Sequence, residues 1–489
     1  MATDVLRQSL TDTISLLEAG AVTSRELAEQ VIDAAERWQP HINAFIAIEA
    51  DELRSAADAA DRRRSVNRTI GMLDGIPLAF KDMFDRPGRN ASMGSTLLAD
   101  RIAKKPATAF ARLSDQGALW AGPLNMAECV ASPSGHNPHF GPVHNPWNVK
   151  HTAAGSSGGS GAAVAARIVY GALGSDTGGS IRLPASVNGV VGVKPTYGRV
   201  SRAGSAPRAP SLDTVGPLAR TARDCALLLD AMAGTDPTDP TTWQAPLEPA
   251  LPLIDMDLSA VRIGSSSTEP FDSCEADVAR AADDACAALA RLCAGRIDRA
   301  LPDLNVLYAL ADTIAKTEAA ALHARFMRER ASEYSAFVYT RTEVGFHLPP
   351  QRYFEALALR ARVLGEFSAR VFDGIDVLAI PVMPICVPTL EATDAATPDA
   401  INQVLGRMTV FTRPFNYLGL PAVSLPCGFD GQGLPIGLQL IGRPFSEPLL
   451  LALAHQYQMV TGWHERSPAP PGQARRASMS VTFTRSQGA

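Results

Sequence analysis

The 489-residue sequence contains few lysines, no closely spaced cysteine pair and no long hydrophobic run. Only six of its 45 basic residues are lysine, so a lysine inside an apolar stretch is unusual in this chain. The seven cysteines form no CxxC motif, which argues against a disulfide scaffold or a zinc site and suits free thiols in the cytoplasm. No uncharged apolar run reaches 18 residues, and the start MATDVLRQSLTD lacks the apolar core of a secretory signal. We therefore expect a cytoplasmic protein that does not interact with membranes.

The overall charge is close to balanced. The 45 basic and 50 acidic residues give a net charge of −5, which offers no general electrostatic reason to bind nucleic acid and leaves only a local basic patch as a route to it. Hydrophobic residues make up 46% of the chain and charged residues 19%. This composition excludes wholesale disorder and allows a large buried core.

Hydrophobic periodicity divides the chain into parts. Residues 1–65 are expected to form helices that pack on the core, one of them starting at a capping box of Thr23 and Glu26. Short apolar runs alternate with Gly, Ser, Pro and Asn clusters over 66–466, the expected catalytic domain, with a helical insertion at about 275–372. The tail, 467–489, is rich in Pro, Ser and Arg and is expected to be poorly ordered. The strands expected within the domain are Val377–Ile380, Ala422–Leu425 and Ile436–Ile441, and Glu447–Val460 is expected to be a closing helix. The apolar run Ile76–Phe80 is expected to be a buried strand or helix.

A glycine-rich segment, Ala154–Gly161, holds four glycines and three serines in eight residues. It lacks the lysine of a phosphate-binding loop and the third glycine of a dinucleotide fingerprint. It does match the G-x-S-x-G nucleophile elbow, with Ser157 as nucleophile, but the elbow needs a preceding strand and Trp147–Ala153 is largely polar. A flexible glycine loop without chemistry is the plain alternative.

Two further segments carry candidate chemistry. In Gly174–Ala185, two glycines leave backbone N–H groups unshielded beside the hydroxyl of Ser180, as an oxyanion hole requires; a simple turn is the alternative. In Gly75–Asp82, the rare Lys81 ends an apolar run, and burial there would lower its pKa enough for it to act as a base. The alternative is a surface pair of Lys81 with Asp82.

Together these segments resemble the amidase signature family, the Ser–cis-Ser–Lys hydrolases. The resemblance runs from Glu18 to about Glu465, with one departure at Ala154, where the family usually has glycine. It implies a single large α/β/α unit with a central mixed, twisted β-sheet flanked by helices. The matching stretches are GIPLAFKD, GSSGGSGAAVAA, GSDTGGSIRLPA, GVKPTYGRVSRAG, SLDTVGPLARTARD and PFNYLGLPAVSLPCG.

The resemblance also implies roles for individual residues. Ser180 would be the nucleophile, Ser156 a relay on a cis peptide bond and Lys81 the uncharged base, 75 residues before Ser156. The expected oxyanion donors are the N–H groups of Thr177, Gly178, Gly179 and Ser180. Residues expected to position the loops are Ser157, Asp176 and Arg182, and those expected to face the acyl side of the substrate are Val130, Ala131 and Ser132.

The function implied is an amidohydrolase that forms an acyl-enzyme on a small amide-type substrate, or on an ester, anilide or carbamate, without cofactor, metal or nucleic acid. The natural substrate and the oligomeric state, including a homodimer, stay open. One alternative is the A subunit of a tRNA-dependent amidotransferase, but its usual Gly- and Tyr-rich segment is missing at 342–353. Another alternative is a non-catalytic binding protein, which would be favoured if Lys81, Ser156 or Ser180 were replaced, and all three are present.

Four histidines lie in the loop before the glycine-rich segment. Metal binding, contact with substrate and an ordinary loop role are the three interpretations, and no carboxylate or cysteine at ligand spacing supports the first. The four residues are His136, His139, His144 and His151.

Overall fold

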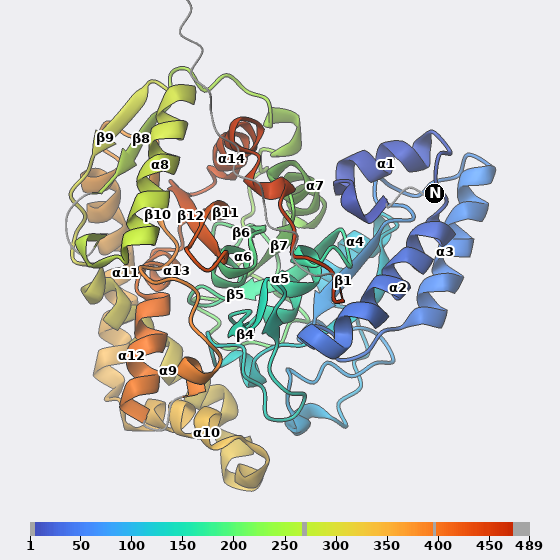
Figure 1. Ribbon diagram of the computed structural model, residues 1–489. Coiled ribbons are helices and arrows are strands. Elements are labelled where there is room, and N and C mark those ends of the chain that lie inside the picture. Colours follow the sequence, from blue (N-terminus) through green and yellow to red (C-terminus); the bar gives the residue numbers. More distant parts are fainter. Residues whose placement is uncertain (1–4, 267–270, 395–397, 473–489) are drawn as a thin grey trace, which may run out of the picture.

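The computed structural model describes residues 5–266, 271–394 and 398–472, and its centre is a ten-stranded sheet in the order β2-β1-β5-β7-β6-β11-β12-β10-β8-β9 (Figure 1). The sheet is mixed: β1 is parallel to β2 and β5, β10 is parallel to β8, and the strands between β5 and β10 run antiparallel. The expected mixed α/β architecture is thus confirmed. The strands are β1 (Pro77–Lys81), β2 (Leu119–Leu124), β5 (Gly171–Asp176), β6 (Val191–Lys194), β7 (Thr214–Ala219), β8 (Arg262–Ser265), β9 (Gly295–Asp298), β10 (Val377–Pro381), β11 (Ala422–Phe429) and β12 (Pro435–Gly442).

Helices cover the sheet, and the buried strands carry the continuous apolar runs typical of a sheet with two covered faces (Figure 1). The helices that pack around the sheet are α4 (Thr108–Asp115), α5 (Gly158–Ala165), α6 (Arg182–Asn188), α7 (Ala222–Met232), α8 (Ala276–Leu292) and α14 (Glu447–Thr461). The helices at one end of the molecule are α9 (Leu304–Glu329), α10 (Ala336–Glu343), α11 (Pro350–Val371), α12 (Pro398–Thr409) and α13 (Arg413–Tyr417).

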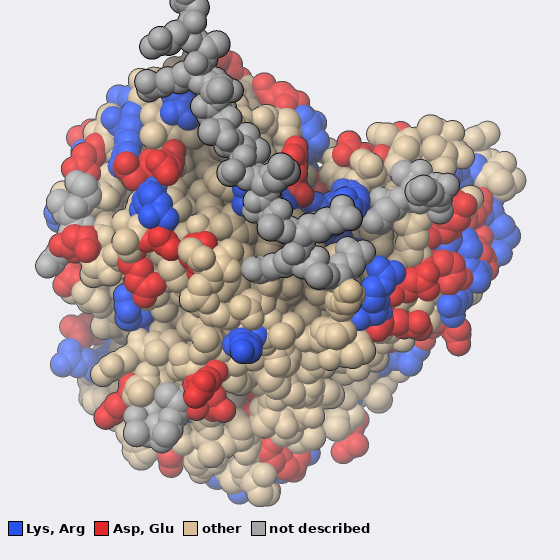
Figure 2. Space-filling view, in the orientation of Figure 1, with Lys and Arg blue, Asp and Glu red and all other residues tan. Residues whose placement is uncertain are grey.

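The N-terminal region contains α1 (Leu10–Glu18), α2 (Ser24–Ile42) and α3 (Ala50–Ser65), which lie on the side of the molecule where β1 is labelled in Figure 1. The predicted capping box starts α2: the Thr23 hydroxyl accepts from the Glu26 N–H, and the Glu26 carboxylate accepts from the Thr23 N–H at 2.8 Å. On the face shown in Figure 2, acidic and basic side chains are interspersed over this region, so neither sign of charge dominates there.

The segment before the glycine-rich loop differs from expectation. Its polar character argued against a strand, yet Asn148–Thr152 forms β4, paired with β3 (His144–Asn145) in a separate two-stranded sheet. A hairpin outside the main sheet needs no buried apolar face, which is why its sequence lacks a strand pattern.

The domain boundaries stay a prediction. Of the expected disordered tail, 467–472 form no helix or strand, and 473–489 lie outside the described residues. Within the described ranges, no helix is both long and apolar enough to cross a bilayer.

Candidate active site

Lys81 is the last residue of β1, and its side chain is completely buried. Its Nζ donates to Ser156 Oγ at 2.7 Å and to Ser175 Oγ at 2.8 Å. Burial lowers the pKa of Lys81 to about 7, against the opposing effect of the Asp213 and Asp176 charges. The alternative of a surface ion pair between Lys81 and Asp82 is therefore wrong: Lys81 is buried, and the Asp82 carboxylate accepts a hydrogen bond from the Ser92 N–H at 3.0 Å.

Ser156 lies in the glycine-rich loop just before α5. The peptide bond between Gly155 and Ser156 is cis, as the family resemblance implied. A Cβ at Gly155 would stand 2.4 Å from the Ser132 carbonyl oxygen, so any other residue there would force the backbone to shift. Ala154, the departure from the family pattern, adopts a φ of +56°, a conformation that glycine takes without cost.

Ser180 lies between β5 and α6, is 8% exposed and lines a pocket. The Ser157 N–H donates to the Ser180 carbonyl at 3.3 Å, which holds the glycine-rich loop against the backbone of Ser180. Within the described ranges, no hydrogen bond joins the Ser180 hydroxyl to Ser156. The structure therefore connects Lys81 directly to Ser156 and brings Ser180 beside them through the backbone.

The predicted oxyanion donors are only partly free. The Gly179 N–H donates to Asp176 Oδ1 at 2.7 Å, so its expected role as a donor to substrate conflicts with the structure. The carboxylate competes for this N–H because the turn after β5 folds back over Asp176. The N–H groups of Gly178 and Ser180 have no acceptor among the described residues, and both residues line the pocket with Thr177.

Asp176 and Arg182 form a fully buried ion pair under the Ser180 loop. Arg182 Nε and Nη2 donate to the two carboxylate oxygens, each at 3.0 Å, and Asn416 Nδ2 adds a bond of 2.8 Å to Oδ1. Burial alone would raise the pKa of Asp176, but the Arg182 charge and these hydrogen bonds hold it well below its usual range. Asp176 stays ionised and fixes the turn that presents Ser180.

Ser157 is also fully buried. Its Oγ donates to the Ser175 carbonyl at 3.2 Å and accepts from the Ser175 N–H at 3.3 Å. These bonds join the glycine-rich loop to β5, which fits a positioning residue and leaves no hydroxyl facing the pocket for the nucleophile elbow. Ser175 itself was missed from the sequence. The only feature of the sequence that could have identified Ser175 as a site residue is its position directly before Asp176.

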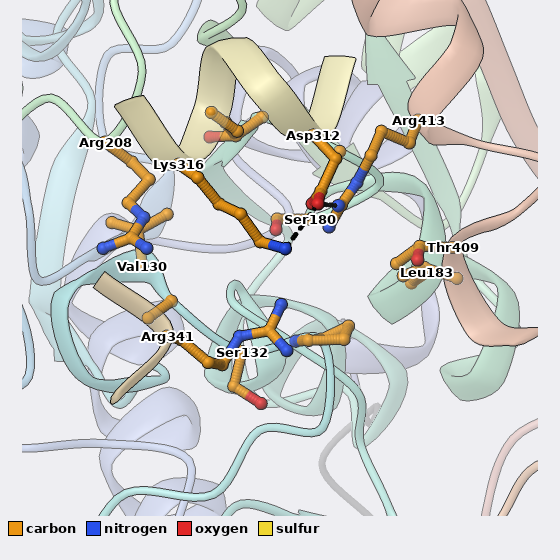
Figure 3. Close-up of a pocket in the computed structure, with 15 residues that line it drawn as sticks. Val130, Ser132, Ser180, Leu183, Arg208, Asp312, Lys316, Arg341, Thr409 and Arg413 are labelled. Carbon is orange, nitrogen blue, oxygen red and sulfur yellow. Dashed lines mark hydrogen bonds and ion pairs between the residues drawn. The ribbon is translucent and has the colours of Figure 1, made fainter. Parts of the chain in front are cut away.

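Val130, Ala131 and Ser132, expected to face the substrate, line the pocket of Ser180. The backbone of Val130 has a φ of +60°, a rare conformation for a β-branched residue. Figure 3 shows further side chains converging there from α9, α10 and the start of α13. The polar and charged pocket residues that sequence reasoning missed are Arg208, Asp312, Lys316, Arg341, Thr409 and Arg413.

The four loop histidines each bind a different partner. His139 Nε2 lies 3.0 Å from Glu128 Oε1, His136 Nε2 lies 2.9 Å from Thr393 Oγ1, and His144 and His151 contact backbone carbonyls. Across the part of the chain that the structure describes, no three His, Cys, Asp or Glu side chains form a group that could hold a metal.

The family model described as Amidase matches residues 26–451. The chain belongs to the amidase family. The A subunit of glutamyl-tRNA(Gln) amidotransferase from Thiobacillus denitrificans is 38% identical over 483 residues, which are 94% of this chain and 98% of the relative. This places the chain among enzymes that act on C–N bonds.

Solved structures of amidase-family proteins share the fold. One was solved in work on an unexpected vestigial protein complex and the evolutionary origins of an s-triazine catabolic enzyme; it has a TM-score of 0.86 at 33% identity, over 93% of this chain and 99% of that chain. The A subunit of glutamyl-tRNA(Gln) amidotransferase from Thermotoga maritima has a TM-score of 0.78 at 28% identity, over 97% of this chain and 100% of that chain.

These relatives correct one prediction. We expected a small-molecule substrate and no nucleic acid, but the relatives are named as subunits of an amidotransferase for glutamyl-tRNA(Gln). The exclusion of nucleic acid is therefore wrong. It rested on the net charge of the whole chain, which does not exclude binding of RNA through a local basic patch.

Proposed function

We propose that this chain hydrolyses a carboxylic amide, with Lys81 as base, Ser156 as relay and Ser180 as nucleophile. The observation that carries the proposal is the 2.7 Å separation of Lys81 Nζ and Ser156 Oγ in a fully buried position. Because the pKa of Lys81 is about 7, an uncharged amine is populated at neutral pH and can accept a proton.

In the first half-reaction, Ser180 Oγ bonds to the amide carbon while its proton passes to Ser156 and a proton of Ser156 passes to Lys81. The N–H groups of Gly178 and Ser180 stabilise the oxyanion, and losing one such donor typically costs about 3 kcal/mol of barrier. The C–N bond then breaks, and the leaving amine takes a proton back through Ser156. An ester between the acyl group and Ser180 remains.

In the second half-reaction, water attacks the ester and gives its proton to the same relay. The ester C–O bond breaks, the carboxylic acid leaves, and Ser180 regains its proton. Each half-reaction returns Lys81 to its uncharged form, so the cycle needs no cofactor.

The test is release of ammonia or amine from a panel of aliphatic amides, amino-acid amides, anilides and carbamates. Wild-type protein should hydrolyse at least one class, and Ser180→Ala should reduce the rate to background while keeping the circular dichroism spectrum. Turnover by Ser180→Ala within tenfold of wild type would overturn the proposal.

A second candidate is the A subunit of a tRNA-dependent amidotransferase, in which the ammonia released would serve a transfer reaction. Two observations support it: the relatives are named as A subunits of this amidotransferase, and the similarity to the Thiobacillus denitrificans protein covers 94% of this chain and 98% of that protein. In a reconstituted amidotransferase lacking its own A subunit, this chain should then restore conversion of glutamyl-tRNA(Gln). Amide hydrolysis by the chain alone, without such restoration, would favour the first candidate.

A further inference from the structure

The pocket of Ser180 holds an excess of positive charge. Four cationic side chains line it, Arg208, Lys316, Arg341 and Arg413, together with one carboxylate, Asp312. Lys316 Nζ lies 2.6 Å from Asp312 Oδ2, and Arg413 Nη1 contacts Oδ1 of the same carboxylate (Figure 3). Asp312 is therefore already shared between two cations.

The other two cations have no carboxylate partner among the described residues. Arg208 is 8% exposed, and its guanidinium donates one hydrogen bond, from Nη1 to Thr342 Oγ1 at 3.3 Å. Arg341 is half-buried, and its guanidinium lies 5.3 Å from the ring centre of Phe337. Burial and the charge of Arg341 lower the pKa of Arg208 to about 10, against the opposing charge of Asp213. Burial and the charge of Arg413 likewise lower the pKa of Arg341, against the opposing charge of Asp312.

Like charges held together away from water destabilise the pocket unless an anion joins them. A guanidinium also presents paired donors that match a carboxylate. We infer that the amide substrate carries a carboxylate, held by Arg208 and Arg341, and carries no ammonium group. This inference rests on the proposed function, because it places the carboxylate in the pocket into which Ser180 opens.

The exclusion of an ammonium group follows from the shortage of acceptors. An ammonium group in the pocket would need a carboxylate, and Asp312, the acidic residue of the lining, already contacts Lys316 and Arg413. Val130 and Ala131 supply apolar contact for a short chain between amide and carboxylate. The substrate class is thus the mono-amide of a short dicarboxylic acid.

The first test measures binding without turnover. Isothermal titration of the Ser180→Ala protein uses three matched compounds: glutaramate, which is anionic; glutaramide, which is neutral; and glutamine, which adds an ammonium group to glutaramate. Glutaramate should bind at least 10-fold more tightly than either of the others. Equal binding of glutaramide or of glutamine would overturn the inference, whatever the protein hydrolyses.

The second test uses turnover. Arg341→Gln should lower kcat/KM for glutaramate by about 10- to 100-fold, mainly through KM, because a charge-assisted bond to the carboxylate is lost. Hydrolysis of glutaramide, which has no carboxylate, should fall by a much smaller factor than hydrolysis of glutaramate, and Arg341→Lys should recover part of the loss. The control is Arg328→Gln, an exposed arginine of α9 outside the pocket, which should change neither rate.

The outcomes separate the two proposals. If neutral and anionic amides are hydrolysed equally well and Arg341→Gln affects both alike, the inference fails and amide hydrolysis stands. If no amide is hydrolysed but glutaramate binds selectively, the proposed function fails and the carboxylate site stands.

Discussion

Lys81 Nζ and Ser156 Oγ lie 2.7 Å apart although 75 residues separate them in the chain. The sheet explains how they meet: Lys81 ends β1, Ser175 lies near the end of β5, and these neighbouring strands are parallel, with Phe80 opposite Leu173. Both strands therefore deliver polar side chains to the same end of the sheet. The glycine-rich loop passes this end of the sheet and brings the Ser156 hydroxyl into hydrogen-bond contact with the Lys81 amine.

The first prediction concerns pH. Protonated Lys81 cannot accept a proton, so kcat/KM should fall about tenfold per pH unit below a pH of about 7 and level off above it. Initial rates measured from mildly acidic to alkaline pH on one uncharged amide test this. A flat profile across neutrality would contradict Lys81 as the base.

The second prediction concerns stability. Lys81→Met removes an amine whose burial is unfavourable, so activity should be lost while the free energy of unfolding at neutral pH stays equal or rises by up to about 3 kcal/mol. The folded pKa of about 7 lies below the ordinary value of 10.5, so the unfolded state binds more protons between them. Wild-type stability should therefore rise with pH across that window, and the variant should lack this rise.

Urea unfolding of both proteins at several pH values measures these quantities. A loss of more than about 2 kcal/mol in Lys81→Met at neutral pH would mean that the lysine has a structural role.

The third prediction concerns Ser175, whose Oγ accepts from Lys81 Nζ at 2.8 Å. Ser175→Ala should lower kcat about 10-fold with little change in KM and should shift the pH profile, because the amine loses one of its two hydroxyl partners. Ser160→Ala is the matched control: Ser160 is equally buried but donates to the Leu173 carbonyl at 3.0 Å, away from the amine. Similar kcat losses in both variants would assign Ser175 to packing alone.

The fourth prediction concerns the buried pair of Asp176 and Arg182. Arg182→Met leaves a buried carboxylate without its cation and should reduce the free energy of unfolding by about 3–5 kcal/mol at neutral pH. Since the pair holds the pKa of Asp176 low, its contribution is present above the ordinary carboxylate pKa and disappears as pH falls through the depressed value. The stability difference should therefore shrink in acid.

Thermal and urea unfolding of Arg182→Met measure this difference. Arg54→Met, which removes a partly exposed pair with Glu29, is the control and should cost less than about 1 kcal/mol. If Arg182→Met is as mild as Arg54→Met, the network does not hold the Ser180 turn.

Much of the fold could be predicted from local patterns. The run before Lys81, the capping box at Thr23 and the apolar strands Val377–Pro381 and Pro435–Gly442 all have periods or end signals that one sequence displays. The polar strand Asn148–Thr152 shows no such pattern, because it forms by pairing with His144–Asn145 and not by burying an apolar face. Strand order across the sheet also depends on contacts between distant segments and left no local signal.

The residues of the site likewise fall into those with a local sequence signal and those without one. Lys81 and Ser180 stand in apolar or glycine-rich contexts that make them candidates, whereas Ser156 is assigned only through the family resemblance, because the local G-x-S-x-G pattern points to Ser157. Arg341 and Arg413 lie on ordinary helices, where an arginine that lines a pocket has the same local sequence as one that faces solvent. Gly179 shows the opposite failure: its sequence context fits an oxyanion donor, but Asp176 takes its N–H.

The most direct test of the account is covalent labelling with a fluorophosphonate probe followed by mass spectrometry of the digested protein. The account predicts a label on Ser180 whose rate of formation falls at least 100-fold in Lys81→Met. A label on Ser157, or a rate on Ser180 that does not change when Lys81 is removed, would contradict it.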